Sequence, residues 1–413
     1  MNRHGNRQMD RRVFLRVAGC AAGVAFWPGW ASGRRLVLLE TGGDELISRI
    51  EWIPYDAGTR GPNEQAQQRC AVRITTNHGA QGWADFSIWA APEQATALLI
   101  RDALVGQAPG DHDNLWRDLY ESGVTLETLG AVDVALWDLR GRMAGKPVHA
   151  LLGAKREKVR TYLSTGHNFG EPGSYAQYAT ECKEAGVGGI KIQPYVEWGA
   201  GRNGMADAGF PDKDMAAYRA VREAVGADYP CMADNYGTYT LDEALRVGRL
   251  LDELGFAWYE SPMPETEAWS DRYVNLAREL RTPICGPEMH PGSFEARVAW
   301  MERGACDVAR IGVHHGGFSA CLQLARACES AGVRLDLHNV SPDAYGDLQL
   351  IATTSETVIG WREIHSLSQS QRVVPGRTTP EPAFDGEGYL AIPTTPGMGV
   401  ELDWPYIFRH RTG

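Results

Sequence analysis

Residues 231–260 read CMADNYGTYTLDEALRVGRLLDELGFAWYE. This stretch predicts a short buried strand ending in Asp234, a helix, and a second strand ending in Glu260. The same alternation continues in both directions, with further apolar strands expected at 159–164, 189–192, 283–286, 307–311 and 333–338. It predicts an α/β fold whose core is a modified (β/α) barrel of the TIM type. A doubly wound sheet is the alternative, but polar residues at the C-terminal ends of successive strands favour the barrel.

The segments flanking this region predict a second domain. Two β-rich runs, Ile47–Tyr55 and 70–84, indicate a small antiparallel sheet, and a helix is expected over Gly130–Ala144. The tail from Gly388 to Leu402 is strand-like and rich in turns, so we expect it to return to the first domain. The predicted organisation is an α+β capping domain at 44–150, a barrel domain at 158–385 and a C-terminal return at 386–413.

The N-terminus carries a candidate export signal. Residues 10–16 read DRRVFLR and precede a mildly apolar stretch at 17–27, a pattern that resembles a twin-arginine signal. The stretch is shorter than the roughly 20 residues that span a bilayer, so we expect residues 1–32 to be removed and the mature chain not to insert into a membrane. The expected location is periplasmic or extracellular. A basic N-terminus with an accidental arginine pair is the alternative, and the protein would then be cytoplasmic.

Composition narrows the possible partners. The net charge of −11 and the lack of a Lys/Arg run argue against nucleic-acid binding. A small anionic substrate would need a local metal or local Lys/Arg to offset this charge. The eight cysteines form no CxxC pair, which indicates buried free thiols.

Three acidic residues follow three consecutive strands. Asp234 and Glu260 end their strands, and Glu288 comes just after the strand Pro283–Gly286. Because equivalent positions on adjacent barrel strands converge at one rim, the three carboxylates are expected to face a common point. Oxygen-only ligation suits Mg²⁺, with Mn²⁺ also possible. The alternative is that each acid is an independent helix cap or surface charge.

Three further residues are candidates for catalysis. His338 closes the seventh strand, and Asp307 is expected at the neighbouring strand end, where a carboxylate would fix the imidazole tautomer and raise its basicity. Lys191 ends the second strand, where it would pair with a substrate carboxylate or a developing enolate. A structural histidine and a snorkelling surface lysine are the alternatives.

Together these residues resemble the mandelate racemase/muconate lactonizing branch of the enolase superfamily. The resemblance runs from about Leu46 to Phe408 and is carried by GAVDVALWDL at 130–139, Lys191 in a Lys-x-Lys position, the three acids, DVARIG at 307–312, and His338. It implies Mg²⁺ on Asp234, Glu260 and Glu288, and α-proton removal by His338 through a metal-stabilised ene-diolate. The implied substrate is a small carboxylate, and the implied assembly is a homo-oligomer.

One departure from the family pattern directs the reaction. Gln193 stands where racemases carry the second lysine of Lys-x-Lys, and an amide cannot take up a proton at ordinary pH. We therefore expect a lyase, dehydrating an aldonate or aldarate to a 2-keto-3-deoxy acid. An epimerase, racemase or cycloisomerase of the same superfamily, or a non-catalytic exported sugar-acid-binding protein, are the alternatives.

The proton donor and the sugar-binding residues complete the prediction. Protonated His338 could serve the leaving hydroxyl in a syn elimination, or Tyr195 or Tyr236 could assist. Residues near the strand ends that could bind sugar hydroxyls are Gln193, Tyr195, Asn235, Tyr236, His290, His314, His315 and Asn339.

Overall fold

The computed structural model describes residues 45–60, 65–199, 208–338, 344–367, 373–382 and 384–412. The predicted export signal at 1–32 and the candidate Asn339 lie outside the described residues.

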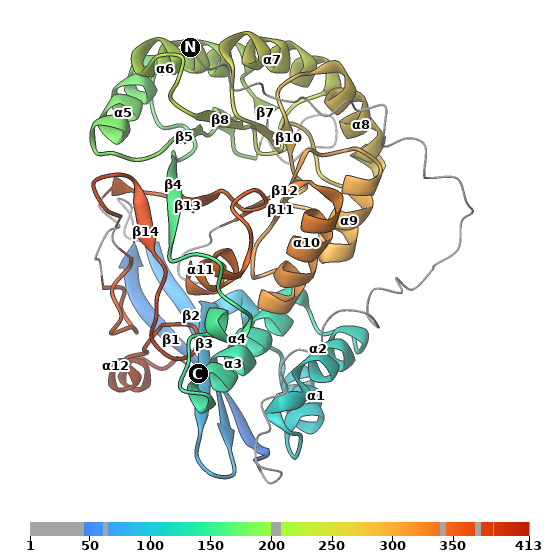
Figure 1. Cartoon of the computed structure of the whole chain (residues 1–413), viewed down its shortest axis with the longest axis vertical. Helices are drawn as coiled ribbons and strands as arrows, with labels where there is room; N and C mark the ends of the chain where they lie inside the picture. The colour runs from blue at the N-terminus through green and yellow to red at the C-terminus, as the bar shows by residue number, and fades with distance from the viewer. Residues whose placement is uncertain are drawn as a thin grey trace, which may run out of the picture. The chain divides into compact units, whose positions relative to one another are not determined.

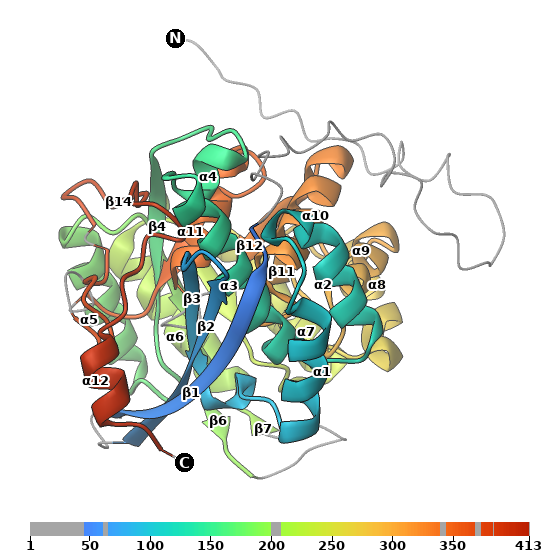
Figure 2. The same cartoon turned by 90° about the horizontal axis from the view of Figure 1, so that it is seen from below.

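The N-terminal part forms an antiparallel sheet of β1 (Ile47–Arg60), β2 (Gln65–Thr76) and β3 (Gln81–Ser87), in the order β1-β2-β3. Its helices are α1 (Gln94–Leu104), α2 (His112–Glu121), α3 (Leu126–Met143) and α4 (Val148–Leu151). Helix α3 lies directly against β3. A Cβ added to Gly82 of β3 would come within 2.3 Å of the main-chain nitrogen of Leu139 in α3, so only glycine fits at this contact. Figure 2 shows this sheet with α1, α2 and α3 beside it. We call this unit the cap.

The central part is a near-closed barrel of parallel strands surrounded by helices, as predicted (Figure 1). Within the described residues the strands pair in the order β12-β11-β10-β9-β8-β5-β4-β13. Their bounds are β4 (Lys158–Ser164), β5 (Ile190–Ile192), β8 (Cys231–Asp234), β9 (Tyr259–Glu260), β10 (Ile284–Cys285), β11 (Val308–Ile311), β12 (Arg334–Leu337) and β13 (Trp361–Ile364). The helices are α5 (Pro172–Glu184), α6 (Pro211–Val225), α7 (Leu241–Leu254), α8 (Ser270–Glu279), α9 (Phe294–Glu302), α10 (Gly317–Ala331) and α11 (Ala344–Thr353). A small hairpin, β6 (Val196–Glu197) with β7 (Ala208–Gly209), follows β5.

Local sequence signals explain the β8–α7–β9 unit. Thr240 and Glu243 form a reciprocal capping box at the start of α7, which satisfies main-chain donors there. Gly255 ends the helix in the left-handed conformation, with φ of 66°. The chain then re-enters the barrel as β9, so that Asp234 and Glu260 lie opposite each other in the parallel register.

The C-terminal tail divides between the two units. Strand β14 (Tyr389–Ala391) pairs antiparallel with β4 at the barrel, whereas we expected the whole tail to return to the cap. Beyond it, Leu402 and Ile407, the latter in α12 (Trp404–Arg409), are buried against Ile53 and Tyr55 of β1.

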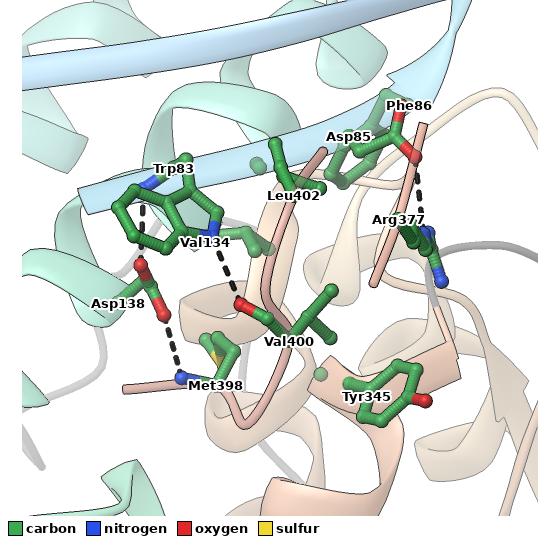
Figure 3. A pocket seen from close by; sticks show the side chains of 12 residues that line it. Trp83, Asp85, Phe86, Val134, Asp138, Tyr345, Arg377, Met398, Val400 and Leu402 are labelled. Atoms are coloured by element: carbon green, nitrogen blue, oxygen red, sulfur yellow. Dashed lines mark hydrogen bonds and ion pairs between the residues drawn. The ribbon is translucent and has the colours of Figure 1, made fainter. Parts of the chain in front are cut away.

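A pocket lies where the tail meets the cap (Figure 3). It is lined by residues of β3, α3, α11 and the tail, and by Arg377. Asp138 accepts hydrogen bonds from the main-chain nitrogens of Trp83 (3.0 Å) and Met398 (2.8 Å), and the Trp83 indole donates to the Val400 carbonyl (2.9 Å). These bonds fix the tail on the cap.

The predicted free thiols are confirmed for the seven cysteines in the described part of the chain, all of which are buried. Across these described segments, no helix is long and apolar enough to cross a membrane.

Candidate active site

The three predicted acids lie at one end of the barrel. Asp234 and Glu260 are the last residues of β8 and β9, and Glu288 follows β10. Tyr236 and Ser261, just past the first two acids, have φ of 50° and 42°. Such left-handed backbone is strained for residues with side chains and clusters at functional sites.

Lys191 lies among these acids and is fully buried. Its Nζ is 2.8 Å from Glu260 Oε1, 2.8 Å from Glu363 Oε1 and 3.7 Å from Asp234 Oδ2. Burial and the neighbouring Arg310 lower the pKa of Lys191, but the three carboxylates outweigh them and the net shift is upward. Lys191 is therefore an ammonium with anionic partners supplied by the protein itself.

A second buried cation, Arg310 of β11, reaches the same group. Its Nε lies 2.9 Å from Glu260 Oε1 and 2.5 Å from Glu288 Oε2. Its Nη2 lies 2.8 Å from Glu363 Oε2, while Nη1 donates to Asp336 and, at 3.2 Å, to the Tyr162 hydroxyl. Arg310 lies within the motif at 307–312, for which the sequence indicates no role, and neither Asp336 nor Glu363 was predicted to belong to the site.

Negative charge exceeds positive charge at this end of the barrel. One ammonium and one guanidinium face the carboxylates of Asp234, Glu260, Glu288, Asp336 and Glu363. Burial raises the pKa of Glu260 well above its usual range, even though Arg310 and Lys191 oppose the shift. The group therefore carries an excess of negative charge that a further cation would offset.

The donor set fits a hard divalent cation by residue type, because Asp234, Glu260 and Glu288 offer only carboxylate oxygens. Their side chains are nevertheless turned towards Lys191 and Arg310. Among the described residues, no group of three or more His, Cys, Asp or Glu side chains has its donor atoms gathered around one point. Binding of a metal would require some of these oxygens to leave their present partners.

His338 follows β12 at the same end of the barrel. Its Nδ1 lies 3.4 Å from Glu288 Oε1, and a quarter of its side chain (25%) is exposed. Burial lowers the pKa of His338, although Glu288 opposes the shift. The imidazole is therefore neutral near pH 7 and able to accept a proton.

The prediction that Asp307 orients His338 is wrong. Asp307 precedes β11, whose parallel register with β12 runs from Val308 opposite Arg334 to Ile311 opposite Leu337. Asp307 thus lies at the N-terminal end of the strand, and His338 lies beyond the C-terminal end of the next. The Asp307 carboxylate instead accepts a hydrogen bond from the Ile284 main-chain nitrogen at 3.0 Å.

At the C-terminal end of β11 the chain places Gly312 and then two histidines. A Cβ added to Gly312 would lie 2.5 Å from His314 Cε1, so glycine makes room for this ring. The His314 ring lies 5.5 Å from that of His338 and 4.0 Å from that of His315. Burial and His338 lower the pKa of His314 to about 3, and burial and His314 lower that of His315. His314 is therefore the neutral ring that faces His338.

Two of the predicted substrate-binding residues lie beside Asp234. The Gln193 amide donates to Asp234 Oδ2 at 3.3 Å, and the Tyr236 main-chain nitrogen donates to Oδ1 at 3.1 Å. The Tyr236 ring packs against His167 and Trp198, with centroids 4.5 and 5.6 Å away. This aromatic group was not predicted, because no sequence motif or regular spacing links His167 and Trp198 to Tyr236.

Other predicted sugar-binding residues are engaged in the protein. Asn235 is fully buried. Its side-chain amide accepts a hydrogen bond from the Tyr218 hydroxyl and donates to the Tyr239 hydroxyl and to the Asp214 carboxylate. The Tyr195 hydroxyl donates to the Gly170 carbonyl. His290 Nδ1 accepts a hydrogen bond from the Gly292 nitrogen at 3.0 Å, and its ring packs on Trp300. The structure thus gives Asn235 and Tyr195 positions that support the fold around the site.

Comparison with known proteins agrees with this geometry. Residues 174–406 match the enolase C-terminal domain-like family, and residues 59–153 match the mandelate racemase/muconate lactonizing enzyme N-terminal domain. The arabinonate dehydratase of Saccharolobus solfataricus is 26% identical, over 83% of this chain and 90% of that protein. The D-galactarolactone cycloisomerase of Agrobacterium fabrum is 27% identical, over 80% of this chain and 88% of that protein.

Solved structures show the same relationship. The D-glucarate dehydratase of Agrobacterium tumefaciens, in complex with magnesium, superposes with a TM-score of 0.80 and is 28% identical. The match covers 89% of this chain and 99% of that one. The chain therefore belongs to the mandelate racemase/muconate lactonizing enzyme family of the enolase superfamily.

Proposed function

We propose that this protein is an acid-sugar dehydratase that converts an aldonate or aldarate to a 2-keto-3-deoxy acid. The observation that carries the proposal is that His338 and the non-titrating Gln193 lie at the same end of the barrel, where the pKa of the neighbouring His314, lowered to about 3, makes that ring a poor second proton acceptor. One proton acceptor without a second lysine suits elimination better than racemisation. The dehydratases among the relatives support this choice.

The substrate carboxylate would bind beside Asp234, Glu260 and Glu288, because His338 lies beside Glu288 and Gln193 lies beside Asp234. Mg²⁺ or Mn²⁺ held by these three residues would offset their negative charge and polarise the substrate carboxylate. Lys191, at 2.8 Å from Glu260, would favour the ionised form of the Glu260 carboxylate and hold it in place.

His338 would take the α-proton of the substrate. The electron pair left on the α-carbon forms the new double bond as the β-hydroxyl departs, and the hydroxyl leaves as water once it receives a proton. Because the Tyr195 hydroxyl is already donated to Gly170, we assign this second transfer to protonated His338, in a syn elimination. The enol product then tautomerises to the 2-keto-3-deoxy acid, so that one water is lost overall.

The test is a screen of aldonates and aldarates with the Mg²⁺-loaded protein, scored for 2-keto-3-deoxy product. A product formed by the wild type and not by His338→Asn would support the assignment. Solvent deuterium at the α-carbon without keto acid would contradict it and favour an isomerase, a class that also occurs among the relatives.

We also propose that residues 1–32 direct export and that the mature protein forms a homo-oligomer. Replacing Arg11 and Arg12 by lysine should retain the protein in the cytoplasm of the producing cell, as measured by fractionation. Recovery of the variant outside the cytoplasm at the wild-type level would contradict the export proposal. A monomeric mass in light scattering would contradict the oligomer.

A further inference from the structure

Arg310 occupies a position that the proposed mechanism does not use. It is fully buried, and its Nε is shared by Glu260 and Glu288, two of the three candidate metal ligands. The opposite edge of the guanidinium is held by Glu363, Asp336 and the Tyr162 hydroxyl. With partners on both edges, the side chain is fixed in place.

The oxygen atoms of Glu260 are largely committed to protein donors. Oε1 accepts from Lys191 at 2.8 Å and from Arg310 at 2.9 Å, which uses both of its lone pairs. Oε2 accepts from the Trp258 indole at 3.0 Å. At most one lone pair of Glu260 is therefore left for a metal ion.

Arg310 also holds one of the two carboxylate oxygens of Glu288. Its Oε2 lies 2.5 Å from Arg310 Nε, and its Oε1 lies 3.4 Å from His338 Nδ1. A divalent cation bound by Glu260 and Glu288 would lie close to the positive charge of Arg310, which already contacts one oxygen of each carboxylate. Repulsion between charges a few ångströms apart is strong where water is excluded.

We propose that Arg310 is a resident counter-cation that competes with the divalent cation for Glu260 and Glu288. It neutralises the two carboxylates in the metal-free protein and lowers the affinity for the metal ion. This inference rests on the proposed function only for the placement of a cation on these ligands. It gives Arg310 a role that is separate from the proton transfers.

The experiment measures binding of Mg²⁺ and Mn²⁺ by calorimetry to the full-length protein and to Arg310→Met and Arg310→Lys. Removing the charge of Arg310 should strengthen metal binding by about tenfold or more, because the repulsion between the guanidinium and a cation a few ångströms away in a buried site disappears. The lysine variant keeps the charge but not the forked geometry, so its gain in affinity should be smaller than that of Arg310→Met. The matched control is Arg69→Met, which removes a buried arginine paired with Asp85 at 2.9 Å in the cap, and should leave metal affinity unchanged.

Thermal unfolding supplies a second readout. Metal-free Arg310→Met should have a lower Tm than the wild type, and Mg²⁺ should raise its Tm more than that of the wild type. If the variant does not fold, Arg310→Met/Asp336→Asn restores part of the charge balance and is compared with Asp336→Asn alone.

Unchanged or weaker metal binding in the charge-removing variants would overturn the inference, since Arg310 would then organise the ligands and not compete for them. The binding series needs no substrate, so it stands apart from the dehydratase assay. A protein without dehydratase activity that still shows the affinity gain would refute the proposed function and leave this inference standing.

Discussion

The His338 ring lies beside the Glu288 carboxylate, with 3.4 Å between Nδ1 and Oε1. The acid that faces the imidazole therefore comes from the segment after β10, and Asp307, at the far end of β11, has no part in holding it. Glu288 also contacts Arg310 at 2.5 Å, so it links the imidazole to the buried cluster of charged side chains around Arg310.

Asp307 gives a direct check of this arrangement. Asp307→Asn keeps an acceptor for the Ile284 nitrogen and lies at the opposite end of the strand from the proposed chemistry. We expect kcat/KM to stay within about twofold of the wild type, whereas loss of an acid-base group costs roughly 10²–10⁴-fold. Steady-state kinetics would measure this, and a loss as large as that of His338→Asn would show that Asp307 supports catalysis.

Lys191 should stabilise the fold as well as organise the site. Lys191→Met leaves Glu260 and Glu363 without the ammonium 2.8 Å from each, which should lower the unfolding free energy by about 3–5 kcal/mol. Urea unfolding of the metal-free protein measures the loss. Lys155→Met is the control, since its exposed pair with Glu329 should contribute at most about 1 kcal/mol. Equal small losses in the two variants would contradict the buried ion-pair account.

Asp214 should make the stability depend on pH. Burial raises its pKa to about 7, although hydrogen bonds from Tyr239, Tyr195 and Asn235 oppose the shift. The unfolded chain has a pKa of about 3.9, so the folded state binds the proton more tightly and this contribution to stability is complete below about pH 4. It is lost as pH rises from about 4 to 7, by at most about 1.4 kcal/mol per pH unit.

Urea unfolding from pH 4.5 to 8 measures this effect by comparing the wild type with Asp214→Asn, which removes the titration. The loss of stability with rising pH should be shallower in Asp214→Asn. Asp212→Asn, an exposed position on the same helix, should keep the wild-type profile. Parallel profiles for the wild type and Asp214→Asn would contradict the raised pKa.

Trp198 should affect substrate binding more than turnover. Trp198 is 56% exposed, and its ring packs edge-on against that of Tyr236, whose main-chain nitrogen donates to Asp234. Trp198→Ala should raise KM by about three- to tenfold, with kcat within about twofold, because it removes apolar contact area and no proton-transfer group. The control is Phe408→Ala, an exposed ring on α12 of the tail. A fall in kcat with unchanged KM would argue against a binding role.

Buried apolar runs explain why most of the barrel could be predicted from the sequence. Strand β13 was missed because Arg362 and Glu363 make up half of it, and their burial depends on partners in other elements, Asp347 of α11 and Arg310 of β11. A charged pair of this kind becomes visible only when the strands are brought together.

The site was predictable at the level of strand ends and less so at the level of single side chains. Alternation along β8 turns Asp234 into the barrel and sends its neighbour Asn235 towards Tyr218 of α6. Asp307 was misplaced because it begins the predicted strand 307–311, whereas His338 closes the next strand, and parallel strands bring together ends of the same kind. Arg310 remained without a role because its four carboxylate partners come from four different segments.

The most direct test of the account is the formation of 2-keto-3-deoxy acid from the aldonate or aldarate that the screen identifies, measured for the wild type and for His338→Asn. The asparagine cannot take up the α-proton, so product formation should fall by at least about 10²-fold, while urea unfolding shows a folded protein. Retention of dehydration by folded His338→Asn would contradict the central claim that His338 is the base.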